Sequence, residues 1–336
     1  MWFEELTGFT EESPQQVRTN ITVKGNVLKS LVNEKVLVCG ELKTPSLAEL
    51  RESVCSSEYK VGQISVREVV ANVQRLHTDE SNAGSLFQVA SQFNLLEMAS
   101  PSLTPEHGVG IYENDRTQGP ACAIAAGAGT IYRNYFAIVN GQTGQSAGNQ
   151  IDCLADIGAA LGNSENRLWE MRNGYALATQ NGLVEIGRRL RAADEDELDK
   201  LRQLLRIGIQ WNTQVTLNDS KRLVSQAYCS ALPVAYSYHS SNYWAEFARL
   251  VLEAAYEATI CTAILNSVRN GNNRVFLTLL GGGAFGNQSE WIIGGLQRAL
   301  NLYRHADLDV AIVSYGSSKW SIHQVYVAFG NLAMPD

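Results

Sequence analysis

The sequence has few features of a nucleic-acid-binding, membrane-spanning or secreted protein. Its 336 residues include 27 Lys and Arg against 34 Asp and Glu, for a net charge of -7, whereas proteins that bind polyanions usually present a basic surface. No segment approaches the ~18 consecutive apolar residues that cross a bilayer, and the first residues lack the basic and apolar regions of a secretory signal. We therefore expect a cytoplasmic protein whose main partners are neither nucleic acid nor membrane.

Cysteine and histidine are sparse and scattered. None of the six cysteines forms a C-x-x-C pair, and several lie in apolar segments, as small buried residues do in reducing compartments. Of the five histidines, only His107, next to Glu106, lies near a candidate site, and a solvated loop histidine is its simpler interpretation. The sequence therefore indicates neither a disulfide framework nor a metal site.

The clearest motif is a glycine-rich segment between a strand pattern that begins at residue 275 and a helix pattern that begins at Ser289. Its loop consists of Gly281, Gly282, Gly283, Ala284, Phe285, Gly286 and Asn287. Glycine lets the backbone approach an anion, and the free N–H groups of a helix start bind it without Lys or Arg. The segment predicts a site for a phosphate-bearing ligand, with a tight turn between closely packed elements as the structural alternative.

The spacing of Gly281, Gly283 and Gly286 also satisfies the dinucleotide pattern G-x-G-x-x-G. A Rossmann unit would carry an acidic residue at the end of the next strand, where it binds a ribose. The next predicted strand ends instead in Ser314 and Tyr315, and the chain leaves room for about one further strand. We therefore expect a phosphorylated ligand, but not NAD bound in the Rossmann manner.

A second group of candidates lies in one strand-to-helix connection. Residues 85–91 predict a buried strand, a loop with Pro and Gly follows at 101–110, and Pro120 can begin a helix of small residues. The connection contains the carboxylates of Glu97, Glu106, Glu113 and Asp115. Carboxylates in a long loop suit acid–base chemistry at a sugar, although Glu106 and Glu113 are more simply solvated loop charges.

Three segments together resemble a known family. They are FQVASQFNLLE at 87–97, TQGPACA at 117–123 and LLGGGAFGN at 279–287. Over about residues 60–330 the chain is similar to a divergent macrodomain of the poly(ADP-ribose) glycohydrolase-like branch, closest to MavL-type ADP-ribosylhydrolases. The resemblance implies ADP-ribose as the ligand, with loop 281–287 around the diphosphate and distal ribose. It also implies that Asn94, Glu97 and Asp115 lie near the anomeric carbon, with Gln92 among the ligand-binding residues.

The sequence departs from this family at two points. Single acids stand at 97, 113 and 115 in place of a tandem Glu-Glu, so we do not expect cleavage of poly(ADP-ribose) chains. No Gly-Asp-Ile segment stands near the N-terminus, so the adenine contact is unassigned. Tyr315 could stack on the adenine or distal ribose, or it could be a half-buried aromatic that closes the sheet.

The expected reaction is hydrolysis of an N- or O-glycosidic bond at the ribose anomeric carbon. Its oxocarbenium-like transition state requires a nearby negative charge, a base for water and an acid for the leaving group. Asp115 is the candidate for water or the leaving group, and Glu97 is a ribose anchor or second acid, with roles that could be exchanged. Glu106 completes the catalytic candidates, and Thr117 and Gln118 could orient a water or a phosphate. No cofactor is expected, and a Mg²⁺ requirement is left open.

Three functions remain open from the sequence. The first is removal of mono-ADP-ribose from a modified protein, arginine-linked by the resemblance, with ubiquitin as a candidate substrate protein on the same basis. The second is a non-catalytic reader of ADP-ribose, and the third is a hydrolase of an ADP-ribose-containing metabolite. The first two both need the glycine loop, but only the enzyme needs the Glu97 and Asp115 carboxylates.

The alternation of strand and helix patterns predicts an α/β protein, a three-layer α/β/α macrodomain-like mixed sheet with extra N-terminal and inserted elements. We expect an N-terminal extension at 1–60, packed on a catalytic domain at 61–336. Strands are predicted at 21–23, 36–39, 85–91, 207–217, 223–229, 275–280, 310–314 and 325–329, with a hairpin at 168–178. Helices are predicted at 46–54, 66–76, 120–133, 183–205, 242–270 and 289–304. The first two are each opened by a capping box, Ser46-Leu-Ala-Glu49 and Ser65-Val-Arg-Glu68. The polar loop 140–149 is a surface connection or a flexible lid, and we favour the connection.

Overall fold

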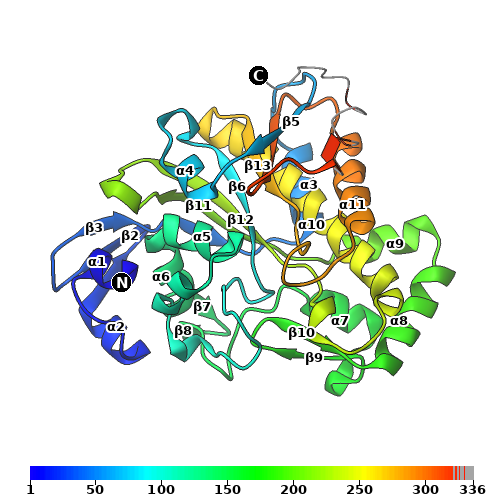
Figure 1. Cartoon of the computed structure of the whole chain (residues 1–336), viewed down its shortest axis with the longest axis horizontal. Coiled ribbons are helices and arrows are strands. Elements are labelled where there is room, and N and C mark those ends of the chain that lie inside the picture. Colours follow the sequence, from blue (N-terminus) through cyan, green and yellow to red (C-terminus); the bar gives the residue numbers. More distant parts are fainter. Residues whose placement is uncertain (321, 324, 326–328, 330–336) are drawn as a thin grey trace.

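A seven-stranded mixed sheet forms the centre of the protein (Figure 1). The computed structural model describes residues 1–320, 322, 323, 325 and 329. The strands, in spatial order, are β4 (Glu41–Lys43), β11 (Gly208–Gln214), β12 (Leu223–Cys229), β6 (Leu86–Ala90), β13 (Arg274–Thr278), β14 (Asp309–Ser314) and β5 (Ser65–Val70). The five strands from β12 to β5 are parallel, and β11 is antiparallel to both of its neighbours.

Helices cover both faces of this sheet, which confirms the predicted α/β/α architecture (Figure 1). One layer contains α4 (Val73–Thr78), α5 (Gln118–Ala125) and α6 (Gly127–Tyr135). The other contains α3 (Leu47–Cys55), α10 (Ser241–Asn270) and α11 (Ser289–Leu302), with α8 (Gln180–Ala192) and α9 (Glu195–Arg202) packed against α10. The long α10 is apolar around most of its circumference because it lies between the sheet and these helices.

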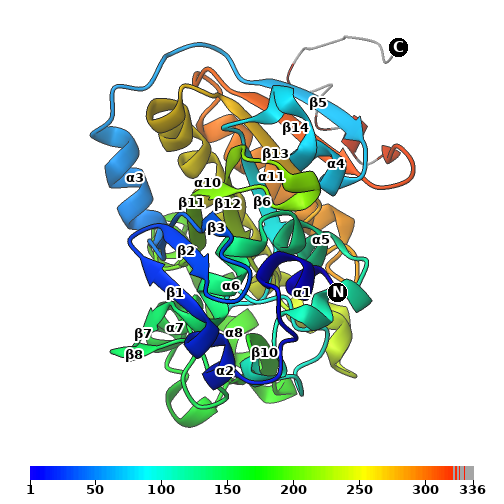
Figure 2. The same ribbon diagram turned by 90° about the vertical axis from the view of Figure 1, so that its left-hand side faces the viewer.

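The N-terminal segment builds a smaller unit beside this domain (Figure 2). It contains α1 (Trp2–Thr7), α2 (Pro14–Asn20) and the antiparallel strands β1 (Ile21–Lys24), β2 (Val27–Ser30) and β3 (Val36–Val38). Its apolar side chains form a second core with residues from the 96–112 region and α6. The division at residue 60 stays a prediction; β4, on its N-terminal side, is an edge strand of the main sheet.

The remaining strands and α-helix lie in the connection between α6 and β11. They are the strand pairs β7 (Ile138–Val139) with β8 (Gln142–Thr143) and β9 (Trp169–Arg172) with β10 (Tyr175–Ala178), and helix α7 (Ala155–Leu161). The second pair is the predicted hairpin, with Asn173 and Gly174 both at positive φ in its turn.

Several predicted elements were wrong in type or extent. The predicted helix 66–76 is largely the strand β5, which pairs with β14 from Ser65 to Val70, and only α4 follows it. Predicted helix 120–133 is two helices that meet at Ala126, and 183–205 is two helices separated by Ala193 and Asp194. The predicted strand at 325–329 falls largely outside the described residues.

Candidate active site

The main cavity opens where two parallel strands separate. β6 pairs with β12 along its whole length, but it pairs with β13 only at Leu86 and Phe87. Beyond this point the gap between β6 and β13 lies at the carboxyl ends of the strands, the usual ligand position in open α/β sheets. The cavity here has a volume of ≈ 830 Å³.

The Gln118 side chain, at the start of α5, completes the free edge of β6. It accepts a hydrogen bond from the Ala90 N–H at 2.8 Å and donates one to the Gln88 carbonyl at 2.8 Å. These are the backbone groups that a longer β13 would have satisfied. Gln118 lines the cavity, but its amide is occupied by β6, so its structural contribution is to keep the strands apart.

Side-chain hydrogen bonds hold the turn after β6 in place. Gln92 accepts from the Met98 N–H at 2.9 Å, and Asn94 accepts from the Leu96 N–H at 3.1 Å. The Asn94 amide also donates to Gln150 at 2.8 Å. Gln92 lines the cavity, whereas Asn94 is buried behind the turn and is absent from the cavity wall. The structure therefore places Asn94 as a brace for the residues that precede Glu97.

Leu95 adopts a left-handed backbone with φ of 64°, which is unfavourable for a branched side chain. Two features hold it there. Its carbonyl accepts from Arg133 Nε at 3.1 Å. Its side chain fills the space above Gly208, where a Cβ would lie 2.5 Å from Leu95 Cδ1. Strained backbone that is held in place by its surroundings is common at functional sites. Here it sets the direction in which the chain continues from Leu95 to Glu97.

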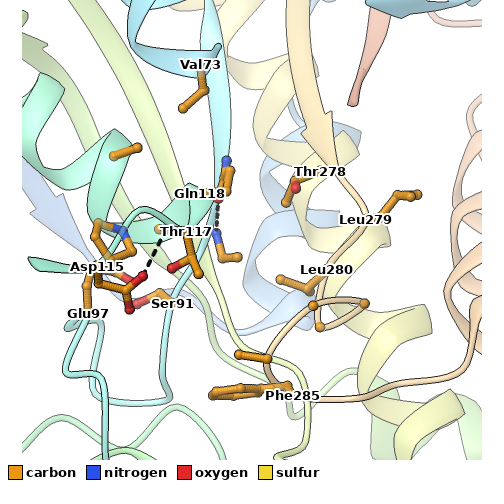
Figure 3. A pocket seen from close by; sticks show the side chains of 18 of the residues that line it. Val73, Ser91, Glu97, Asp115, Thr117, Gln118, Thr278, Leu279, Leu280 and Phe285 are labelled. Atoms are coloured by element: carbon orange, nitrogen blue, oxygen red, sulfur yellow. Dashed lines mark hydrogen bonds between the residues drawn. The ribbon is translucent and has the colours of Figure 1, made fainter. Parts of the chain in front are cut away.

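Glu97 leaves this turn as a buried carboxylate on the cavity wall (Figure 3). Its side chain is 2% exposed. Within the described part of the chain, neither carboxylate oxygen has a hydrogen-bond partner. The Ser91 hydroxyl lies nearby, 3.3 Å from the Gln92 and Leu96 carbonyls. Burial raises the pKa of Glu97 to about 8, although Arg133 and Ser91 act together to lower it, and Asp115 adds repulsion. Glu97 is therefore largely protonated at neutral pH.

The Glu97 carboxylate packs against the first turn of α5. A Cβ at Gly119 would lie 2.4 Å from Glu97 Oε2 and 2.0 Å from the Ala90 carbonyl oxygen. Position 119 must therefore be glycine for strand, helix and carboxylate to meet. The small residues in this helix, noted in the sequence, serve this close approach.

Asp115 lies beside Glu97 on the same wall, and its carboxylate accepts from the Thr117 N–H at 2.8 Å (Figure 3). Thr117 and Glu113 also line the cavity. Glu106 does not: it accepts from the Ala147 N–H at 2.8 Å, in the polar loop 140–149. Of the three predicted catalytic carboxylates, the structure brings together Glu97 and Asp115.

The glycine loop forms the opposite wall (Figure 3). The cavity-lining part runs from Leu279 to Phe285, between β13 and α11. Within the described residues, the backbone N–H groups of Gly281, Gly283, Ala284 and Phe285 have no hydrogen-bond partner. A cluster of free amides next to a helix start can bind phosphate oxygens. Two basic residues that the sequence analysis did not select, Arg116 and Lys319, also line the cavity.

The end of the glycine loop is structural in its contacts. The buried Asn287 donates to the Leu232 carbonyl at 2.8 Å, and its N–H donates to the Gly281 carbonyl at 2.9 Å. Gly281 and Gly286 both have positive φ, of 74° and 69°. Neither Gly286 nor Asn287 lies on the cavity wall, and both fix the shape of the loop that does.

Aromatic side chains add a part of the site that sequence motifs did not indicate. Phe285 lies 5.3 Å from the Tyr175 ring and 5.5 Å from the Tyr236 ring, between centroids, and all three line the cavity. Trp2 contributes from the N-terminal segment. Tyr315 also lines the cavity and is 79% exposed. The hairpin predicted at 168–178 placed Tyr175 on a strand, but only the fold brings these rings together.

Arg133 lies behind the turn after β6 and is fully buried. Its guanidinium stacks on Tyr228, with Cζ 3.6 Å from the ring centroid, and its Nη2 donates to Thr130 at 3.1 Å. Its Nη1 has no partner within the described residues. Arg133 lowers the pKa of Glu97 by its charge, although no ion pair joins the two within the part of the chain that the structure describes.

The described residues contain no group of three or more His, Cys, Asp or Glu side chains that could hold a metal ion. None of their helices is both long and apolar enough to cross a membrane.

Comparison with known proteins gives similarity to solved structures only. No family model and no curated protein match the chain. A poly(ADP-ribose) glycohydrolase from Deinococcus radiodurans in complex with ADP-ribose has a TM-score of 0.45 at 12% identity, covering 86% of this chain and 92% of that one. A poly(ADP-ribose) glycohydrolase from Thermomonospora curvata has a TM-score of 0.44 at 10% identity, covering 94% and 95%. At these values the similarity is too weak to assign a family.

Proposed function

We propose that the protein is an ADP-ribosylhydrolase that removes mono-ADP-ribose from a modified protein by hydrolysis of the glycosidic bond. The observation that carries the proposal is Glu97, a buried carboxylate with two unpaired oxygens, beside Asp115 in a large cavity. The free amides of loop 281–285 form the facing wall. A ligand with hydroxyl groups at one end and phosphates at the other satisfies both walls.

The two carboxylates suit the two proton transfers of such a hydrolysis. Asp115 accepts a proton from water as its oxygen bonds to the ribose anomeric carbon. The glycosidic bond breaks, its electron pair goes to the leaving group, and protonated Glu97 supplies a proton or hydrogen bond on that side. The raised pKa of Glu97 supports this assignment, because the acid must hold its proton near the working pH.

An arginine linkage is the finer part of the proposal. The wall near Asp115 also contains Glu113 and Trp2, and the Trp2 backbone N–H donates to the Glu113 carboxylate at 3.3 Å. Carboxylates and an indole together favour a delocalised cation such as guanidinium, through charge attraction and cation–π contact.

The test is release of ADP-ribose from proteins modified at arginine or at glutamate, with binding of free ADP-ribose measured by calorimetry. We expect release from the arginine-linked substrate, lost in Asp115→Asn and Glu97→Gln and kept in the control Glu106→Gln. Binding without release from either substrate would support a reader. Absence of both would refute the assignment of the cavity to ADP-ribose.

A further inference from the structure

Glu11, outside the cavity, binds the segment that carries Asp115. One carboxylate oxygen accepts from the Val109 N–H at 3.0 Å and the other from the Gly110 N–H at 2.6 Å. The Tyr135 hydroxyl donates to the first oxygen at 2.7 Å. The two N–H groups stand at the start of the short 3₁₀ helix η3 (Gly110–Asn114), so Glu11 caps a helix 98 residues away in the chain.

Two glycines in the segment that Glu11 binds leave room for its carboxylate. Gly108 has φ of 83°, and a Cβ there would lie 2.4 Å from Glu11 Oε2. A Cβ at Gly110 would lie 2.8 Å from the same oxygen. Both positions therefore need glycine while Glu11 is in place.

The capped helix contacts both proposed catalytic residues. The Tyr112 hydroxyl accepts from the Glu97 N–H at 3.0 Å, and Tyr112 is 1% exposed. Asp115 follows directly, with its N–H bound to the Tyr112 carbonyl at 3.1 Å. The path from Glu11 to the cavity therefore consists of one short helix, held at its start by Glu11 and ending at Asp115.

We propose that Glu11 is a positioning residue for the hydrolysis, because it fixes η3 and so sets Asp115 relative to Glu97. This inference rests on the proposed function. It makes the N-terminal segment part of the active-site machinery, in addition to its contribution of Trp2 to the cavity wall. A displacement of about 1 Å in a catalytic group lowers turnover by roughly 100-fold, so loss of the cap has a kinetic consequence.

The test compares Glu11→Gln with Glu12→Gln, a neighbouring exposed acid whose side chain has no partner in the described part of the chain. Glutamine has nearly the same shape as glutamate, but its NH₂ group faces one of the two loop N–H donors and cannot accept a hydrogen bond from it. We expect amide hydrogen exchange at 109–115 to accelerate at least tenfold in Glu11→Gln and to stay unchanged in Glu12→Gln. Tyr135→Phe, which keeps both loop bonds, should resemble wild type.

Kinetics on the same variants separates positioning from general stabilisation. We expect kcat per folded molecule to fall roughly 10- to 100-fold in Glu11→Gln, with KM and the Kd for ADP-ribose within about twofold. Unchanged exchange at 109–115, or faster exchange with unchanged kcat, would overturn the positioning role. Wild-type protein that releases no ADP-ribose would overturn the proposed function first, whatever the exchange data show about the cap.

Discussion

Gln118 occupies the place of a neighbouring strand beside Ala90, with its side-chain carbonyl 2.8 Å from the Ala90 N–H. β6 therefore ends without an unsatisfied edge although β13 has already turned away. Without Gln118, the Ala90 N–H and the Gln88 carbonyl would have no partner, which would favour closure of the gap between β6 and β13. Gln118 on one side and the glycine loop on the other therefore both help to keep the cavity open.

The pH dependence of turnover should report the Glu97 proton. Because burial raises the pKa of Glu97 to about 8, we expect wild-type kcat to fall as the pH rises through that value. Glu97→Gln should be roughly 100-fold slower at pH 7 and lack this inflection. Glu106→Gln, whose carboxylate lies outside the cavity, should keep the wild-type profile. An alkaline inflection that persists in Glu97→Gln would contradict the assignment.

Glu97 should also affect stability in a pH-dependent way. Its folded pKa of about 8 lies above the ordinary value of 4.5, so the folded state holds the proton more tightly. Its contribution is fully present below pH 4.5 and is lost as pH rises through 8, at roughly 1.4 kcal/mol per pH unit at most. Denaturant unfolding from pH 5 to 9 should show this decline in wild type relative to Glu97→Gln.

The comparison with the variant is needed because His77 has the opposite effect. Burial lowers the pKa of His77 to about 4 from 6.5, so its contribution is lost as pH falls through that interval. His77 is present in both proteins, and the difference between them isolates Glu97. A flat difference across pH 5 to 9 would mean that Glu97 is ionised in the folded protein.

Gly119→Ala should be costly because the new methyl group meets both Ala90 and Glu97. We expect a loss of roughly 1–3 kcal/mol in unfolding free energy, together with a fall in kcat from displacement of the carboxylate. Gly294→Ala is the control, since it is exposed in α11 with no atom within 4 Å of the added Cβ. It should stabilise by roughly 0.5–1 kcal/mol, and a Gly119→Ala protein equal to it would refute the close packing.

Gly283→Ala tests contact of the ligand with the glycine loop. No atom lies within 4 Å of a Cβ at this position, so the melting temperature should not change. If the diphosphate approaches the loop backbone, the methyl group should weaken ADP-ribose binding about tenfold. Gly148→Ala, equally open but outside the cavity, should change neither quantity. Unchanged calorimetric affinity in Gly283→Ala would place the phosphates elsewhere.

Glu257→Gln should lower stability without lowering turnover. The buried Glu257 accepts from Arg51 at 2.6 Å and from Arg298 at 2.6 Å, in the layer of α3, α10 and α11. Loss of its charge leaves two guanidinium groups partly unpaired, at a cost of roughly 3–5 kcal/mol. Glu246→Gln, which removes a looser pair with Arg249 at 3.9 Å, should cost less than about 1 kcal/mol. Denaturant unfolding and kcat at 25 °C on all three proteins check this.

Local sequence signals predicted much of the framework. The Ser46 capping box, the Asn173-Gly174 turn and the strand–glycine–helix order around Gly281 each depend on neighbouring residues. The Ser65-x-x-Glu68 pattern shows the limit of such signals. Here Glu68 instead accepts from Ser314 at 2.6 Å and from the Lys319 N–H at 3.0 Å, and parallel pairing with β14 overrides the helix signal.

The site was predictable as a set of segments, but not in the function of each side chain. Glu97 and Asp115 line the cavity with Gly281 to Phe285. Asn94 and Asn287 lie behind it because their partners, such as Gln150 and Leu232, come from distant loops. Trp2, Tyr175 and Tyr236 were not predicted as site residues because they come from distant segments. No local sequence pattern indicates which aromatic ring will face a cavity.

The cavity wall draws on both ends of the described chain, from Trp2 to Lys319, and on turns between them. Contacts across such separations form only after large loops have closed, and loop closure slows folding. The sheet needs closures of similar length, since Ser65 in β5 pairs with Asp309 in β14. Helices form locally, whereas the ligand site is complete only when the sheet and the N-terminal segment are both in place. In refolding, secondary structure should return before ligand binding does, and the interval between them measures the docking of the N-terminal segment.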